Sequence, residues 1–116
     1  MVKNMGEINM LYDFYGDLLT DRQKTVMEFY YGDDFTLSEI AEHTGISKQA
    51  VHDTVHKAEK ALYSYESALG LLSRYRQSEE QIRKASAILE KVMANINDER
   101  IRNQLNTVME IMTALE

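Results

Sequence analysis

The stretch that decides the fold is "LSEIAEHTGISKQAVHDTVHKA", residues 37–58, in which two runs with helical spacing flank Gly45. In a helix-turn-helix, a small residue lets the first helix approach the second, and a glycine-like position follows in the turn. Ala41 and Gly45 occupy those two positions. The sequence therefore predicts a helix-turn-helix, whose second helix begins at Lys48.

Helical spacing divides the predicted motif into a core and an outward face. Ile40, Ile46 and Val51 are the apolar residues that tie the two helices together, and Ala41 and Gly45 complete the motif core. The residues expected to meet nucleic acid, called here the recognition face, are Ser47, Lys48, Gln49, His52, Asp53, His56, Lys57 and Lys60.

The rest of the chain also has helical periodicity. It contains no proline, and apolar residues recur at three- and four-residue intervals. This pattern predicts an all-α protein with helices over residues 8–19, 21–31, 37–44 and 48–69. The predicted helix ends are capping boxes at Thr20 with Gln23 and at Thr36 with Glu39, an N-cap at Ser47, and a left-handed Gly32 closing the second helix.

Two longer amphipathic helices are predicted after Gly70. Their apolar stripes are Ile82, Ala85, Leu89, Val92 or Met93 and Ile96, and then Ile101, Leu105, Val108, Met112 and Leu115, with Asn97 or Asp98 as the cap between them. We expect a helix-turn-helix domain over 1–70 and a helical extension over 71–116. The stripes pack either on the rest of the same chain or on a second copy or another partner, and their size favours a homodimer.

Composition limits the classes of protein to consider. The 116 residues include no cysteine, which excludes disulfides, thiolate catalysis and cysteine-based zinc sites. No run approaches the roughly 18 apolar residues of a membrane span, and Glu7 interrupts the region where an export signal would need apolar residues. We therefore expect a cytoplasmic protein without a membrane span.

Charge is distributed unevenly along the chain. Residues 1–67 hold twelve acidic and six basic side chains, a net charge of −6, whereas residues 68–116 hold seven of each. Nucleic-acid-binding domains usually carry a basic excess, because neutralising phosphates supplies most of their affinity. The predicted helix-turn-helix lies in the acidic part.

Enzymatic and metal-binding interpretations are weak. His52 and His56 are four residues apart, and Asp53 or Glu59 could complete a ligand set, but a hydrolytic zinc helix carries glutamate where Asp53 stands. His43 is expected to be exposed at its helix end. The sequence has no phosphate-binding glycine loop or nucleophile elbow. We predict neither an enzyme nor a cofactor or metal site.

Aromatic residues are dense in the first third of the chain, at Tyr12, Phe14, Tyr15, Phe29, Tyr30 and Tyr31. Such residues can form base-stacking platforms, which normally have lysines and arginines around them. Here the neighbours include Asp13, Asp17, Glu28 and Asp33. We therefore favour core packing between the first two helices.

The motif resembles the fourth region of bacterial sigma factors. For this chain the resemblance implies the architecture of the winged-helix-like DNA-binding superfamily, but without strands. A closer resemblance is to the YlxM family of small bacterial helix-turn-helix proteins, carried by "LYDFYGDLLTDRQ" (11–23), "YYGDDFTLSEIAE" (30–42), "ISKQAVHD" (46–53) and "ALYSYESALG" (61–70). Ser47, Lys48, Gln49, Ala50, Val51 and Asp53 match the family's serine-basic-glutamine-alanine-valine-x-aspartate run. His52 and His56 stand where an aromatic and a cationic residue are common, and histidine carries little charge near neutral pH.

The resemblance implies a regulator of, or participant in, the signal recognition particle pathway. Two hypotheses of function remain open. In the first, the recognition face binds promoter DNA or the RNA of the particle. In the second, the protein is an adaptor that binds a protein component of the particle, such as its GTPase, and no nucleic acid.

Overall fold

The computed structural model describes residues 5–115, and within them every regular element is a helix or helical turn. In chain order these elements are α1 (Met5–Tyr15), the 3-10 turn η1 (Gly16–Leu18), α2 (Asp21–Met27), the π-helical turn η2 (Glu28–Gly32), α3 (Leu37–Thr44), α4 (Lys48–Leu69), α5 (Leu71–Ala94) and α6 (Glu99–Ala114). The all-α prediction is confirmed. Residues 1–4 and 116, which belong to the predicted domains, lie outside the described residues.

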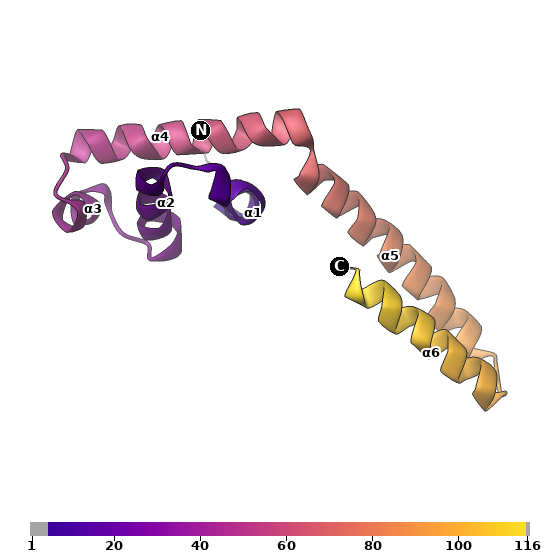
Figure 1. Ribbon diagram of the computed structural model, residues 1–116. Helices are drawn as coiled ribbons and strands as arrows, with labels where there is room; N and C mark the ends of the chain where they lie inside the picture. The colour runs from indigo at the N-terminus through magenta and orange to yellow at the C-terminus, as the bar shows by residue number, and fades with distance from the viewer. Residues whose placement is uncertain (1–4, 116) are drawn as a thin grey trace. The chain divides into compact units, whose positions relative to one another are not determined.

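The chain divides into two compact units, Met1–Leu72 and Ser73–Glu116. In the first unit, α1, α2 and α3 all pack against the long helix α4 (Figure 1). Its core consists of Ile8, Leu11, Tyr15, Leu19, Val26, Met27, Ile40, Val51, Val55, Ala58, Leu62 and Leu72. Because these residues come from all four helices, burying them fixes the position of the helix-turn-helix on the other helices.

Side-chain caps begin the helices where the sequence predicts them. The Gln23 backbone N–H donates to Thr20 Oγ1 over 3.2 Å, and the Thr20 N–H donates to Gln23 Oε1 over 3.0 Å. Thr36 and Glu39 form the same reciprocal pair at α3. Each capping box satisfies two backbone groups that a helix start would otherwise leave unpaired.

The first predicted helix is shorter than expected, because α1 ends at Tyr15 and a 3-10 turn follows. Gly16 is buried there, and a Cβ at this position would lie 3.2 Å from the Tyr12 ring. The turn carries Leu19 into the core with 6% exposure, whereas Leu18 is 54% exposed. Leu19, and not Leu18, is therefore a core residue.

The predicted left-handed conformation of Gly32 is wrong; Asp34 adopts it instead, with φ 55°. The second predicted helix continues past α2 through the π-helical turn, and the Phe35 N–H reaches back to the Phe29 carbonyl over 3.0 Å. The Phe29 and Phe35 rings stack with centroids 5.1 Å apart. Helices commonly end with a left-handed residue followed by an apolar contact of this kind, and aspartate tolerates that conformation better than most residues.

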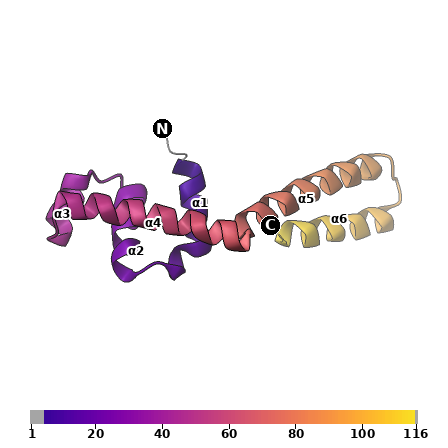
Figure 2. The same ribbon diagram turned by 90° about the horizontal axis from the view of Figure 1, so that it is seen from above.

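In the second unit, α5 and α6 run antiparallel as a helical hairpin (Figure 2). Asp98 caps α6 by accepting from the Arg100 and Ile101 N–H groups, which selects Asp98 from the two predicted caps. The Arg102 side chain donates to the Met93 and Ile96 carbonyls over 3.4 Å each. These bonds reach one carbonyl in the last turn of α5 and one in the connection, and they hold the connection between the two helices.

The hairpin buries its inner stripe only partly. Its half-buried apolar residues are Ile82, Ala85, Leu89, Met93, Ile96, Leu105, Met109 and Met112. Met93 therefore belongs to the predicted stripe and Val92 does not, because Val92 is 42% exposed. Ile101, Val108 and Leu115 of the predicted stripe do not pack within the hairpin, since Leu115 is 71% exposed and the other two 42%.

A second row of apolar residues is exposed on the hairpin. This hairpin face comprises Ile88 and Val92 on α5 and Ile101, Val108, Ile111 and Leu115 on α6. At about 100° of rotation per residue, both groups are displaced from the inner stripe in the same rotational sense along their helices. In an antiparallel pair this displacement brings both groups to one side of the hairpin.

Candidate nucleic-acid interface

The helix-turn-helix core has the contacts that the sequence predicts. Ile40 and Val51 are fully buried, and Ala41 and Ile46 are half-buried against the same core. Gly45 ends α3 in the left-handed conformation with φ 75°, and its N–H donates to the Ala41 carbonyl over 2.9 Å. The turn between α3 and α4 is thus closed by a backbone conformation that favours glycine.

Ser47 fixes the start of α4, because its Oγ accepts the Ala50 N–H over 3.0 Å. Val51, Val55, Ala58 and Leu62 then recur at helical spacing and are buried along one side of the helix. The opposite half of the circumference is left to solvent. Burial of the apolar side therefore sets which residues α4 presents outward.

Every residue of the recognition face is exposed, and Gln49, His52, Asp53, His56, Lys57 and Lys60 lie on that outward side. Ser47 is the N-cap before α4, and Lys48, three residues before Val51, lies in the first turn on the side of the buried stripe. The face contains three lysines, two histidines, one serine, one glutamine and one aspartate: Lys48, Lys57, Lys60, His52, His56, Ser47, Gln49 and Asp53. Exposed lysines and amides are the groups that contact phosphates and base edges in known complexes. The structure places seven of the predicted residues on α4 and Ser47 at its N-cap.

Asp53 pairs with neighbours within the recognition face. The Gln49 side-chain amide donates to Asp53 Oδ1 over 3.0 Å, and His52 Nδ1 lies 3.6 Å from the same oxygen. The His52 and His56 rings stack one turn apart, with centroids 6.4 Å from each other. The bond to Asp53 occupies one of the two N–H donors of the Gln49 amide and leaves its oxygen available as an acceptor.

Glu59 points away from the recognition face and is 4% exposed. The Tyr31 hydroxyl donates to its carboxylate. This burial separates Glu59 from His52 and His56, so the ligand set that includes it does not assemble. Among residues 5–115, no group of three histidine, aspartate or glutamate side chains is placed to hold a metal ion.

The aromatic residues pack mainly as the sequence predicts. Tyr15 is buried, and Tyr12, Phe29, Tyr30 and Tyr31 are partly buried against the core. Phe14 differs from the prediction, with 37% exposure. His43 is exposed as expected, but its ring also lies 5.4 Å from Phe29 and 5.1 Å from Phe35, centroid to centroid.

Two partly buried carboxylate–tyrosine pairs join segments that sequence spacing does not relate. Besides the bond from Tyr31 to Glu59, Tyr15 donates to Glu66 Oε1 over 2.7 Å, and burial followed by this bond raises the Tyr15 pKa. The Leu71 N–H donates to the Tyr15 hydroxyl, and the Leu72 N–H donates to Glu66 Oε1. No periodicity connects residues 51 positions apart, so only the folded structure reveals these contacts.

Sequence comparison places the chain among known proteins. The sequence model of a family described as "Putative helix-turn-helix protein, YlxM / p13 like" matches residues 2–108. A UPF0122 protein of Listeria welshimeri is 39% identical over 111 residues, which cover 96% of this chain and 99% of that protein. A UPF0122 protein of Desulforamulus reducens is 47% identical over 81 residues, 70% of this chain and 69% of its own length.

A third relative, a UPF0122 protein of Lactococcus lactis, is 47% identical over 74 residues, 64% of this chain and 67% of that protein. Within residues 5–115, no helix is both long and apolar enough to cross a membrane. The helix-turn-helix that α3 and α4 build is the feature named in the family description. With this motif and a match over residues 2–108, the chain belongs to the UPF0122 family of YlxM/p13-like helix-turn-helix proteins.

Proposed function

We propose that this protein is a cytoplasmic, non-enzymatic binder of nucleic acid that docks the recognition face of α4 into a groove. The observation that supports the proposal is that all eight predicted residues are exposed, six of them, from Gln49 to Lys60, opposite the buried stripe of α4, and Ser47 and Lys48 at its N-terminus. The motif core behind them is closed by Val51 and Ile40, so the helix is held rigidly for docking.

The charge of the N-terminal part limits the affinity. Only Lys48, Lys57 and Lys60 provide cations on the recognition face, and residues 1–67 carry a net charge of −6. Few phosphates can therefore be neutralised, and the surrounding acidic field opposes the approach of a polyanion. Binding is expected to be weak and strongly dependent on salt.

The resemblance to the YlxM family suggests which nucleic acids to test. Promoter DNA fits a sigma-region-4-like docking of α4, and the RNA of the signal recognition particle fits the pathway that the resemblance implies. Gln49 is the residue suited to reading a base edge, because its amide can both donate and accept. Gln49→Ala should weaken a preferred sequence more than random sequence.

A binding assay in about 0.1 M salt tests the proposal on both candidates. Purified protein is mixed separately with duplex DNA, with particle RNA and with the particle's protein component. Retention of a nucleic acid by the wild type, and its loss in Lys48→Ala/Lys57→Ala, is expected. Capture of the protein component with no retention of DNA or RNA would overturn groove binding and leave the adaptor.

The adaptor is the second candidate, and the acidic excess of residues 1–67 favours it. Asp13, Asp17 and Asp33 are all exposed in this part of the chain. An acidic surface complements a basic protein partner such as the particle's GTPase, and such complementarity speeds association. Pulldown with and without nuclease separates the two functions, because capture by an adaptor survives nuclease treatment.

We also propose that the hairpin face joins two copies of the chain. Ile88 is 63% exposed and Ile111 59%, and within residues 73–115 no side chain is fully buried. A soluble protein rarely leaves a continuous apolar row in water, and a row of this kind is typical of an interface. A two-fold dimer through it would carry two recognition helices.

A further inference from the structure

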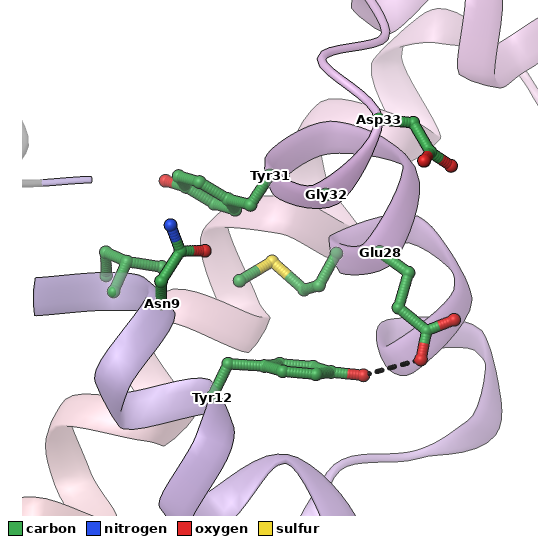
Figure 3. A pocket seen from close by; sticks show the side chains of 8 residues that line it. Asn9, Tyr12, Glu28, Tyr31, Gly32 and Asp33 are labelled. Atoms are coloured by element: carbon green, nitrogen blue, oxygen red, sulfur yellow. Dashed lines mark hydrogen bonds between the residues drawn. The ribbon is translucent and has the colours of Figure 1, made fainter. Parts of the chain in front are cut away.

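The N-terminal unit contains a cavity of about 310 Å³ that lies apart from the recognition face. It opens between α1 and the segment formed by α2 and η2 (Figure 3). Its lining residues are Ile8, Asn9, Tyr12, Met27, Glu28, Tyr31, Gly32 and Asp33. No residue of α4 lines it, so a ligand here would not compete directly for the recognition face.

Apolar and aromatic side chains form the walls of the cavity. Ile8 and Met27 are buried at 1% and 2% exposure and belong to the core. The Tyr31 hydroxyl is held by Glu59, and the Tyr30 ring meets the Tyr31 ring edge-on at 5.0 Å between centroids. Because these contacts fix Tyr31, its ring is a preorganised wall.

Negative charge gathers beside the Tyr12 ring. The Tyr12 hydroxyl donates to Glu28 Oε1 over 2.9 Å (Figure 3). Burial, then this bond and the charges of Glu28 and Asp17, raise the Tyr12 pKa to about 12. The phenol therefore stays neutral at physiological pH and keeps donating, while the second Glu28 oxygen takes part in no hydrogen bond within residues 5–115.

The cavity rim adds further acceptors. The Asn9 amide projects from α1, and the Asp33 carboxylate stands at the end of η2 (Figure 3). None of the eight lining residues is basic. The chemistry of the cavity is thus aromatic and apolar on its walls and anionic at its mouth, which matches a cation on a hydrocarbon stem.

We propose that this cavity holds the guanidinium group of an arginine side chain, presented by a basic segment of a partner protein. A guanidinium can lie flat on the Tyr12 ring while its N–H groups donate to the Glu28 carboxylate and to the side-chain amide oxygen of Asn9. Ile8 and Met27 would pack against the methylene stem. A nucleic acid does not fit, because Glu28 and Asp33 repel phosphate.

The probe is the peptide acetyl-Gly-Arg-Gly-amide, titrated into ¹⁵N-labelled full-length protein and followed by amide chemical shifts. Saturable shifts confined to residues near 8–12 and 27–33 are expected. The citrulline peptide, which keeps the shape and loses the charge, should bind at least about tenfold more weakly. The lysine peptide should bind at least about threefold more weakly than the arginine peptide, because an ammonium cannot stack flat on a ring.

Charge-matched variants test the site against a general field effect. Glu28→Gln should lower affinity for the arginine peptide about tenfold, whereas Glu42→Gln, an equal loss of charge on α3 outside the cavity, should change it less than about twofold. Tyr12→Phe keeps the ring and should retain binding. Tyr12→Leu removes it and should weaken binding about fivefold.

Several results would overturn the proposal. They are equal effects of Glu28→Gln and Glu42→Gln, equal binding of the citrulline or lysine peptide, shifts that map elsewhere, or no saturable shift up to about 10 mM peptide. Native-like amide dispersion in each variant shows that it is folded. Lys48→Ala/Lys57→Ala should leave peptide binding intact, so failure of this proposal and failure of nucleic-acid binding are distinguishable.

Discussion

Gly45 is the residue on which the placement of α4 depends. Its φ of 75° lies in the left-handed region, where an L side chain costs about 1–2 kcal/mol. Gly45→Ala should therefore lower the free energy of unfolding by about that amount, measured by urea denaturation. No atom lies within 4 Å of a Cβ built at Gly45, so the loss would arise from the backbone and not from a clash.

Gly32→Ala is the matched control for this prediction. Gly32 also has open space around a built Cβ, but its φ is not positive. Alanine at position 32 should leave the free energy of unfolding unchanged or raise it by up to about 1 kcal/mol, because alanine lowers the conformational entropy of the unfolded chain. Equal effects of the two substitutions would show that the turn conformation assigned to Gly45 is wrong.

Two partly buried tyrosines, Tyr12 and Tyr31, should make the fold sensitive to alkali. Burial and then Glu28 raise the Tyr12 pKa to about 12, and burial and then Glu59 raise the Tyr31 pKa further. The unfolded phenols titrate near about 10, so the protonated phenols stabilise the folded state fully below that pH and lose this contribution as pH rises through the folded pKa values. Urea unfolding should show stability falling above about pH 10.

The double variant Tyr12→Phe/Tyr31→Phe cannot titrate at these two positions. Its stability should be lower near neutral pH, because Glu59 loses a donor while buried. Its further decline between about pH 10 and 12 should be shallower than in the wild type. Parallel declines would mean that other groups control alkaline unfolding.

At the scale of an element, Asp53 is expected to oppose the proposed binding of nucleic acid by α4. It places a negative charge on the recognition face and holds the Gln49 amide at 3.0 Å. Asp53→Asn removes the charge and keeps the shape, so it should tighten binding to duplex DNA about threefold to tenfold. Fluorescence anisotropy at fixed salt measures the change.

Glu90→Gln provides the control for net charge, since Glu90 is an exposed residue of α5 in the other unit. It should change DNA affinity by less than about twofold. If Glu90→Gln tightens binding as much as Asp53→Asn, the gain reflects total charge and α4 is not the contact surface.

The elements themselves follow from local signals in the sequence. The side chains of Thr20, Thr36 and Ser47 cap α2, α3 and α4 as predicted, because a cap needs only neighbouring residues. The end of η2 could not be predicted in this way. There the π-helical turn shifts the left-handed position from Gly32 to Asp34, and the stacking of Phe29 on Phe35 that accompanies it is visible only in the folded chain.

The site shows a similar division between local and distant information. The exposure of Lys48, Gln49 and His52 follows from helical periodicity, whereas the burial of Glu59 depends on Tyr31, 28 positions earlier. The cavity likewise combines Tyr12 with Glu28, which no motif relates. Periodicity therefore predicts which residues face outward, and contacts between distant segments require the structure.

For the whole molecule, the hairpin face predicts a homodimer. Light scattering at micromolar protein should give the mass of two chains, and Ile88→Lys/Ile111→Lys should give one, because a charge buried in an apolar interface is costly. Leu18→Lys, on an exposed leucine of η1, should leave the dimer intact. A monomer mass for the wild-type chain would contradict the assignment.

The sequence predicts only in part which apolar residues of α5 and α6 face the other helix, because each helix carries apolar residues on two neighbouring sides. On α6 the residues Leu105 and Met109 face inward, while Val108 and Ile111 face outward. The apolar arc is wide enough to serve both sides, so a 4-3 spacing alone cannot separate the inner stripe from the hairpin face. Which of these residues are buried depends on where the other helix of the hairpin packs.

The central claim is that α4 binds nucleic acid through a few lysines, and the salt dependence of DNA affinity tests it most directly. Three contacts per chain predict a slope of log affinity against log salt near about −3 for a monomer, or about −5 to −6 for a dimer on two half-sites. Lys48→Ala/Lys57→Ala should reduce the slope by about two per chain, while Lys84→Ala/Lys91→Ala, equal charge losses at exposed positions of α5, should leave it unchanged. A slope that responds equally to both double variants, or an absence of binding at the lowest salt, would contradict the claim.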